Sequence, residues 1–201
     1  MSGWITEVIT QAGYLGIFLL MLLESIFPPI PSELIIPFAG FSAAQGNLNV
    51  FGVILAATVG SLVGAAPWYI VARLFGLERV RWLADRFGRW FTLNADEIDT
   101  AARWFTRWGK PIVLFGRLFP IIRTLISVPS GLAKMPALTF IGFSALGMLI
   151  WNTVLVMAGF VLHQHYHLVE AWLDPLTYIV LGAVVAVYLY RLVTWRPSKA
   201  R

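Results

Sequence analysis

Long apolar runs separated by short polar stretches dominate the chain, and their lengths predict a helical membrane protein. A helix of about 20 apolar residues crosses the hydrocarbon core of a bilayer. Four segments with few charged residues are long enough, and each is predicted to be a transmembrane helix: residues 1–27, 50–75, 135–162 and 173–195. The pattern therefore predicts an all-α integral membrane fold.

Two further apolar stretches, residues 28–49 and 111–134, contain too much proline and glycine for a straight helix. Proline removes a helix donor and clashes with the preceding turn. Non-helical backbone persists in a bilayer only where it lines a cavity or packs against protein. Each stretch is therefore predicted to be a re-entrant helical hairpin. The residues expected to shape the two hairpins are Pro28, Pro29, Pro31 and Pro37 in the first, and Pro120, Pro129 and Gly131 in the second.

The two predicted hairpins resemble each other in sequence. Residues 27–37 (FPPIPSELIIP) align without gaps with residues 119–129 (FPIIRTLISVP), with four identities. With four spanning helices, the two hairpins would enter from opposite sides of the membrane. This is the inverted repeat of many transporters, whose binding site lies between broken helices near the midplane. A chance match between two apolar stretches is the alternative.

Residues 76–110 are strongly charged, with seven basic residues against five acidic ones. Apolar residues recur in this stretch at helical spacing, which predicts two amphipathic helices lying in the membrane interface. The basic residues here and in the tail, residues 196–201, predict a cytoplasmic location under the positive-inside rule. If both hairpins return to the side they enter from, the N-terminus shares that side. Both termini are therefore expected to be cytoplasmic.

Composition supports a single membrane domain over residues 1–201. Hydrophobic residues make up 59% of the chain and charged residues 12%, whereas soluble domains carry about 25% charged residues. The net charge of +5 could indicate nucleic-acid binding. The basic residues flank apolar spans, however, and this pattern favours anchoring to anionic lipid. His163 and His167 share a helix face and could ligate a metal, but a short polar connection needs no metal, so no metal or other cofactor is expected.

The candidate chemistry rests on ionisable residues inside apolar segments. Each such charge costs at least about 2.5 kcal/mol at membrane depth, so these residues usually mark a pathway. The planar guanidinium groups of Arg117 and Arg123 suit phosphate oxygens. Glu24 and Glu33 could take up and release a proton, since burial and a neighbouring arginine act oppositely on a carboxyl group. Alternatively, Arg–Glu pairs merely tie the hairpins together. Tyr69 and Asn152 are the remaining polar groups expected to line a cavity.

Three stretches together carry a family resemblance. They are residues 24–40 (ESIFPPIPSELIIPFAG), residues 64–76 with the pattern G-x4-Y-x3-RLFG, and residues 116–151, which begin GRLFPIIR. In this order they resemble the DedA family, which shares the VTT, or SNARE-associated Golgi protein, fold. The family usually has an acid after the glycine that corresponds to Gly64, where this chain has Ala65.

The resemblance implies a multi-pass transporter of the bacterial inner membrane. Some members recycle the lipid carrier undecaprenyl phosphate with the help of an ion gradient, and residues matching Glu24, Glu33, Arg117 and Arg123 are needed. The expected substrate is thus a polyprenyl phosphate or anionic lipid bound by the arginines, with H⁺ or Na⁺ coupled through the acids.

Other functions remain open from the sequence. One is a proton- or Na⁺-coupled transporter of a small soluble ion or osmolyte. Another is a non-transporting envelope scaffold that docks partners through residues 76–110. Small residues on the helix faces would also allow a homodimer. An enzyme is not expected, because no nucleophile with a base is evident and no catalytic residues are predicted.

Overall fold

The computed structural model describes residues 2–26, 32–91, 95–161 and 190, and the regular structure of these residues is helical. The predicted fourth span apart from residue 190, the whole tail and the first three hairpin prolines lie outside the described residues. Among those described, three helices are long and apolar enough to cross a membrane: Glu7–Ile26, Val50–Val80 and Ala137–Val161. The predicted all-α membrane class is confirmed for this part of the chain. The helices are α1 (Ser2–Ile26), α2 (Ser32–Ala44), α3 (Val50–Phe91), α4 (Ala95–Gly116), α5 (Pro120–Leu125), α6 (Ser127–Leu132) and α7 (Ala137–Val161).

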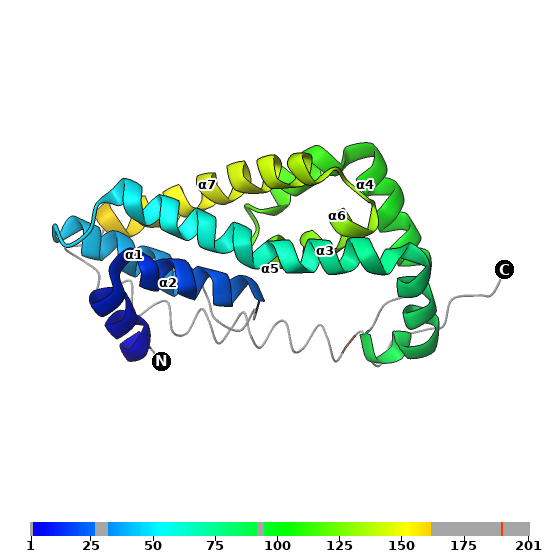
Figure 1. Cartoon of the computed structure of the whole chain (residues 1–201), viewed down its shortest axis with the longest axis horizontal. Coiled ribbons are helices and arrows are strands. Elements are labelled where there is room, and N and C mark those ends of the chain that lie inside the picture. Colours follow the sequence, from blue (N-terminus) through cyan, green and yellow to red (C-terminus); the bar gives the residue numbers. More distant parts are fainter. Residues whose placement is uncertain (1, 27–31, 92–94, 162–189, 191–201) are drawn as a thin grey trace.

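The two long helices α3 and α7 lie side by side and contact each other (Figure 1). The side chain of Asn152 on α7 donates a hydrogen bond of 3.1 Å to the Thr58 hydroxyl on α3. The backbone of α3 changes direction at Gly76, where φ is 75°, a value that favours glycine. Beyond Gly76 the charged end of α3 leads to α4. Two helical segments are therefore present within residues 76–110, and their placement in the membrane interface stays a prediction.

Helix α1 packs along the first half of α3 through glycines of α3. A methyl group at Gly64 would come within 2.6 Å of the Leu22 carbonyl oxygen, and one at Gly60 would collide with the Phe18 carbonyl. Such contacts let two helix backbones approach closely. The residue numbers of the two partners rise together along the contact, so α1 and α3 run in the same direction.

Two hydrogen bonds mark the ends of this contact between α1 and α3. Where it begins, the backbone N–H of Asn49 donates a hydrogen bond of 2.7 Å to the Tyr14 hydroxyl. Where it ends, the Trp68 indole donates one of 3.2 Å to the Ser25 carbonyl. Helix α1 bends at Gly13, which leaves a straight segment of about 20 Å at 1.5 Å per residue. That length is less than the roughly 30 Å of the hydrocarbon core.

The predicted division into a span at 1–27 and a hairpin at 28–49 stays a prediction, and the described structure shows how the two segments pack. Residues 14–26 of α1 and the whole of α2 pack against each other and form the two limbs of one reversal of the chain. Tyr14, next to the bend of α1, lies beside the start of α3. The N-terminal turns of α1 lie at the opposite end of α3 from its charged end (Figure 1), whereas the sequence had predicted the N-terminus and residues 76–110 on one side. Hydropathy marks a segment as buried but does not show where in the membrane its helix ends.

Helix α2 is continuous, although its proline predicted a break. Pro37 lies inside the 13-residue helix and removes only the donor for the carbonyl four residues earlier, at Glu33. Close packing on α7 holds the helix in place. A methyl group at Gly40 would collide with the Val156 carbonyl, and one at Gly159 with the Pro37 carbonyl.

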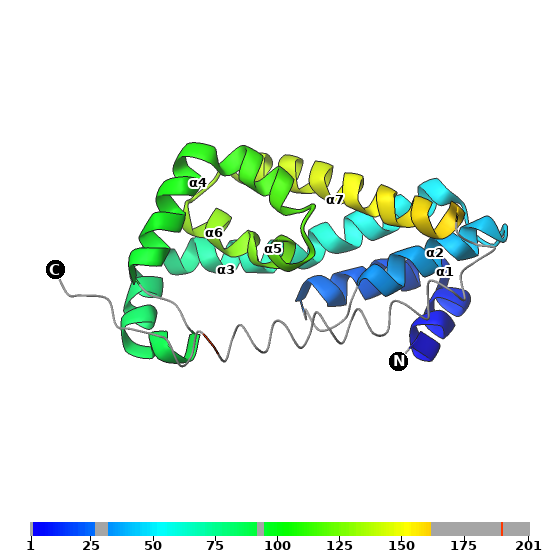
Figure 2. The ribbon, with the colours of Figure 1, turned by 180° about the vertical axis from the view of Figure 1, so that it is seen from behind.

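The second half of the chain repeats the arrangement of the first. The end of α4 runs in the same direction as the start of α7, since Gly109 lies against the Met135 side chain and Gly147 against the Leu114 carbonyl. The chain then reverses at residues 117–119, and α5 and α6 return between α3 and α4 (Figure 2). Helix α6 packs on α3, where a methyl group at Gly131 would collide with a backbone carbonyl.

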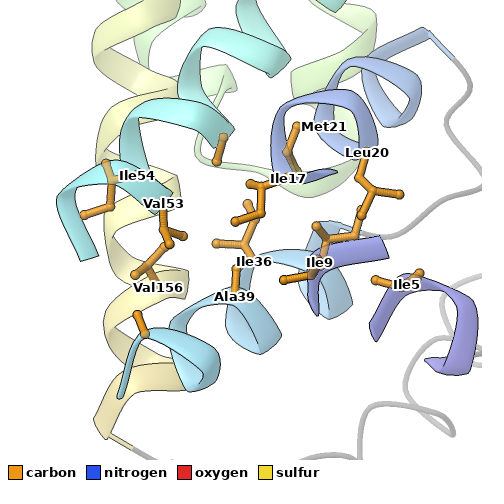
Figure 3. Close-up of a cluster of buried hydrophobic side chains, with 13 residues drawn as sticks. Ile5, Ile9, Ile17, Leu20, Met21, Ile36, Ala39, Val53, Ile54 and Val156 are labelled. Atoms are coloured by element: carbon orange, nitrogen blue, oxygen red, sulfur yellow. The ribbon is translucent and has the colours of Figure 1, made fainter. Parts of the chain in front are cut away.

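The packing of the two halves is reciprocal. The first limb of each reversal, α1 or the end of α4, lies along the long helix of its own half. The returning helix, α2 or α6, packs on the long helix of the other half. A cluster of buried side chains from α1, α2, α3 and α7 fills the first half (Figure 3). A second cluster, around Phe140, fills the other.

Candidate functional site

The four predicted ionisable residues meet where the two reversals approach each other. Glu24 lies near the end of α1, Glu33 in the first turn of α2, and Arg123 in α5. The Arg123 Nη2 donates a hydrogen bond of 2.6 Å to Glu24 Oε1 and lies 3.4 Å from Glu33 Oε1. It also donates to the Ser32 hydroxyl. One guanidinium group therefore joins the second half of the chain to both carboxylates of the first.

Arg117 follows α4 and is 3% exposed, but neither carboxylate is among its hydrogen-bond partners in the described structure. Its Nη1 donates to the Arg123 carbonyl oxygen. Its Nη2 donates to the hydroxyls of Ser127 at 3.0 Å and Ser144 at 3.2 Å. The guanidinium carbon lies 5.6 Å from the centre of the Phe140 ring. Of the two arginines, Arg123 forms the Arg–Glu ion pairs considered in the sequence analysis, and Arg117 does not.

Breaks in the backbone explain why Arg117 finds an acceptor here. Helix α5 begins with Pro120 after the extended residue Phe119, and proline suits the first helical turn because its missing donor would have no partner there. The helix ends after six residues, which leaves carbonyl groups without helical donors. The guanidinium of Arg117 satisfies one of them, that of Arg123.

A cavity of about 20 Å³ lies beside the two arginines. A cavity this small holds about one water molecule, so the site as observed has no room for a phosphate group. The predicted cavity residue Asn152 lines it, and so does Ala65, at the position where the family usually carries an acid. Its lining residues are Glu24, Ser25, Ser61, Ala65, Arg117, Arg123, Met148, Trp151 and Asn152.

Four buried polar atoms in the described structure have no hydrogen-bond partner. They are Glu33 Oε1, Arg117 Nε, Arg123 Nε and Trp151 Nε1. A buried polar group without a partner costs about 1–3 kcal/mol, so such atoms are rare and point to a ligand or water site. Sequence reasoning missed Trp151. The available signal was an indole N–H, a donor that needs an acceptor, inside a span without charges.

Tyr69 lies outside this cavity, although it was expected to line one. Its hydroxyl donates a hydrogen bond of 2.5 Å to the Met135 carbonyl and accepts one of 2.5 Å from Arg73. The Arg73 guanidinium also donates to the Met135 carbonyl, at 2.6 Å. The Tyr69 ring stacks on Phe140 with centres 4.3 Å apart. Tyr69 thus joins α3 to the turn between α6 and α7.

Residues 30–161 match the VTT domain. The match covers more than half of the chain, so the chain belongs to the VTT-domain family, as its resemblance to DedA proteins indicated. The chain is also similar to "Undecaprenyl phosphate transporter A" of Staphylococcus aureus (strain NCTC 8325 / PS 47), with 33% identity over 94% of each chain. The protein of the same name from Bacillus subtilis (strain 168) is 29% identical over 98% of each chain.

A relative with a different name is also similar. The "Alkaline phosphatase-like protein" of Lactococcus lactis subsp. cremoris (strain MG1363) is 40% identical over 94% of this chain and 89% of its own. No solved structure matches the chain.

Proposed function

We propose that the protein is a membrane transporter that moves undecaprenyl phosphate, or a related anionic lipid, across the bacterial inner membrane. The main observation is that Arg123 pairs with two carboxylates, and that the buried Arg117 bonds the Arg123 carbonyl beside it, at the breaks of an apolar helical bundle. Arginine binds phosphate oxygens through paired N–H donors and stays charged at any physiological pH. The names of the two transporter relatives support the same substrate class.

Competition for Arg123 provides the coupling in this proposal. Its guanidinium is engaged by Glu24 and Glu33, and the adjoining cavity is too small for a phosphate. Binding of H⁺ or Na⁺ to the carboxylates would release Arg123, and the phosphate of the lipid would then replace them as its partner. Loss of the lipid would restore the observed pairing. Each state keeps a counter-charge beside the buried arginine.

The reciprocal packing of the two halves supports alternating access. We propose that the α1–α2 and α4–α6 reversals are re-entrant hairpins that enter from opposite sides of the membrane. The arginines and carboxylates lie where the two hairpins meet, between the long helices α3 and α7. Sites at such an interface are exposed to each side in turn when one repeat moves against the other.

The alternative of a phosphatase has no support in the described residues. The name of the lactococcal relative suggests phosphate chemistry. Within the part of the chain that the structure describes, no group of three or more His, Cys, Asp or Glu side chains could hold a metal ion.

We expect phosphate-dependent lipid binding to depend on the arginine pair. Purified wild-type protein should bind undecaprenyl phosphate more tightly than undecaprenol, which lacks the phosphate. The double variant Arg117→Gln/Arg123→Gln should lose this preference by about 100-fold or more, because each hydrogen bond to a charged group contributes about 1.5–3 kcal/mol and about 1.4 kcal/mol is tenfold in affinity. Isothermal titration in detergent measures both lipids.

The matched control for this experiment is Arg103→Gln/Arg107→Gln on the exposed face of α4, which should retain the preference. A double variant at positions 117 and 123 that binds as tightly as the wild type would contradict the proposal. If the wild-type protein binds neither lipid, the result would favour transport of a soluble ion or osmolyte.

The orientation in the membrane follows from the basic residues. The first 72 residues contain no Lys or Arg, so the positive-inside rule places the start of α3 outside and its charged end inside. Because Tyr14 contacts Asn49, the proposal also places the N-terminal end of α1 outside. This reverses the cytoplasmic N-terminus expected from the sequence.

Single-cysteine labelling tests this orientation, since the chain has no cysteine of its own. In intact spheroplasts, a membrane-impermeant maleimide should label Glu7→Cys and Asn47→Cys, whereas Glu78→Cys should react only after permeabilisation. All three positions are exposed. Labelling of only one of the first two would contradict the packing of α1 on α3, and labelling of Glu78→Cys alone would invert the orientation.

A further inference from the structure

Three buried N–H donors that lack acceptors belong to residues around one cavity. They are the Nε atoms of Arg117 and Arg123 and the indole Nε1 of Trp151. None of these atoms has a hydrogen-bond partner in the described part of the chain. All three groups donate and cannot accept. A ligand that satisfies them together must therefore offer several acceptor atoms, as an oxyanion does.

Three other donors near the cavity are already used by the protein. Both terminal nitrogens of Arg117 donate to acceptors of its own half, and Nη2 of Arg123 donates to Glu24 and Ser32. The Nε atoms are therefore donors that a ligand could take without breaking these bonds. A ligand that also displaced the carboxylates would gain the Nη2 donor of Arg123.

Trp151 differs from the other polar groups on the helices around it. The amide of the adjacent Asn152 donates a hydrogen bond to the Thr58 hydroxyl, and the Trp68 indole donates one to the Ser25 carbonyl. The Trp151 indole nitrogen is buried but has no acceptor in the described residues. Across the cavity the lining residues of α3 are the small Ser61 and Ala65, so this wall can accommodate a ligand with little repacking.

We propose that the Trp151 indole is a third donor to the phosphate of the transported lipid, beside the guanidinium Nε atoms of Arg117 and Arg123. This inference rests on the proposed function and adds a recognition residue to it. The indole is neutral, so it contributes a directed hydrogen bond without further charge. It would favour a phosphate monoester, whose three terminal oxygens can meet three donors, over a lipid that presents only a hydroxyl.

The test is Trp151→Phe, which removes the N–H and keeps an aromatic ring. Binding of undecaprenyl phosphate by the purified protein should weaken about 10-fold, as expected for one hydrogen bond to a charged acceptor. Binding of undecaprenol should not change. Trp68→Phe is the matched control, because its N–H already serves the Ser25 carbonyl, and it should leave the ratio of the two affinities unchanged.

A second variant tests the cavity without touching any donor. Ala65→Leu fills the space from α3 and should also reduce the preference for the phosphorylated lipid. The inference is overturned if Trp151→Phe weakens both lipids equally, which would indicate a packing role, or if it weakens neither. It is also overturned if Ala65→Leu binds the phosphorylated lipid normally. In each of these cases the proposed function stands as long as the arginine double variant loses the preference.

Discussion

Replacing Arg123 by methionine is expected to lower the free energy of unfolding by about 3–5 kcal/mol, the cost of removing one partner from a buried ion pair. The Arg123 side chain is 11% exposed and that of Glu24 is 5% exposed. Without the guanidinium, two carboxylates from α1 and α2 would remain close together with no counter-charge. Thermal or denaturant unfolding of the purified protein in detergent measures the loss.

Arg117→Met is the matched comparison, because this arginine is even more deeply buried but bonds only neutral groups. Its loss should cost less, about 1–3 kcal/mol for acceptors left without donors. Adding Glu24→Gln to the Arg123→Met variant should recover part of the stability, with a coupling free energy of about 1–3 kcal/mol. Equal losses for the two arginine variants, or no recovery, would show that Arg123 is not the counter-charge of the two acids.

This asymmetry between the arginines bears on the transport cycle. A buried ion pair contributes little net stability, but leaving one partner unpaired is expensive. Exchange of one anionic partner for another avoids that penalty. In the proposed cycle Arg123 changes partners between the carboxylates and the lipid phosphate, whereas Arg117 stays attached to the α5–α6 backbone and keeps the site in shape.

The convergence of Glu24, Glu33, Arg117 and Arg123 was predictable from the sequence for a physical reason. Charges in apolar segments must be paired or hydrogen-bonded, and the chain has few such groups from which to build a pair. The breaks around Pro120 were predictable too, since proline interrupts helical hydrogen bonding. The pairing of each acid with a particular arginine could not be predicted, because it depends on how the two halves of the chain pack together.

The course of α1 could not be predicted from hydropathy. An apolar helix that ends in the interior of a protein and one that crosses the bilayer have the same composition. The bend at Gly13 and the contact between Tyr14 and Asn49 leave no signal in the apolar pattern. The role of Trp151 in the site was missed for a related reason, since tryptophan in a membrane span is usually interpreted as an interfacial anchor.

Gly131→Ala is expected to separate α6 from α3 and to destabilise the protein by about 1–3 kcal/mol, the usual cost of overpacking. The added methyl group would collide with the Tyr69 carbonyl and lie 2.8 Å from the Ala72 Cβ and 2.9 Å from the Arg73 backbone nitrogen. Backbone atoms cannot rotate away, so the helices themselves must move. Because α6 also carries Ser127, which holds Arg117, lipid binding should weaken as well.

Gly142→Ala on α7 is the control for this substitution, since a methyl group there meets no atom within 4 Å in the described structure. It should be neutral or stabilising by up to about 1 kcal/mol, the difference in helix propensity between alanine and glycine. Gly40→Ala should behave like Gly131→Ala, because it collides with the Val156 carbonyl in the other half. If the hairpins are reciprocal, both variants lose stability and lipid binding together. A Gly131→Ala protein as stable as Gly142→Ala would show that close contact between α6 and α3 is not required, and the reciprocal arrangement would lose its main support.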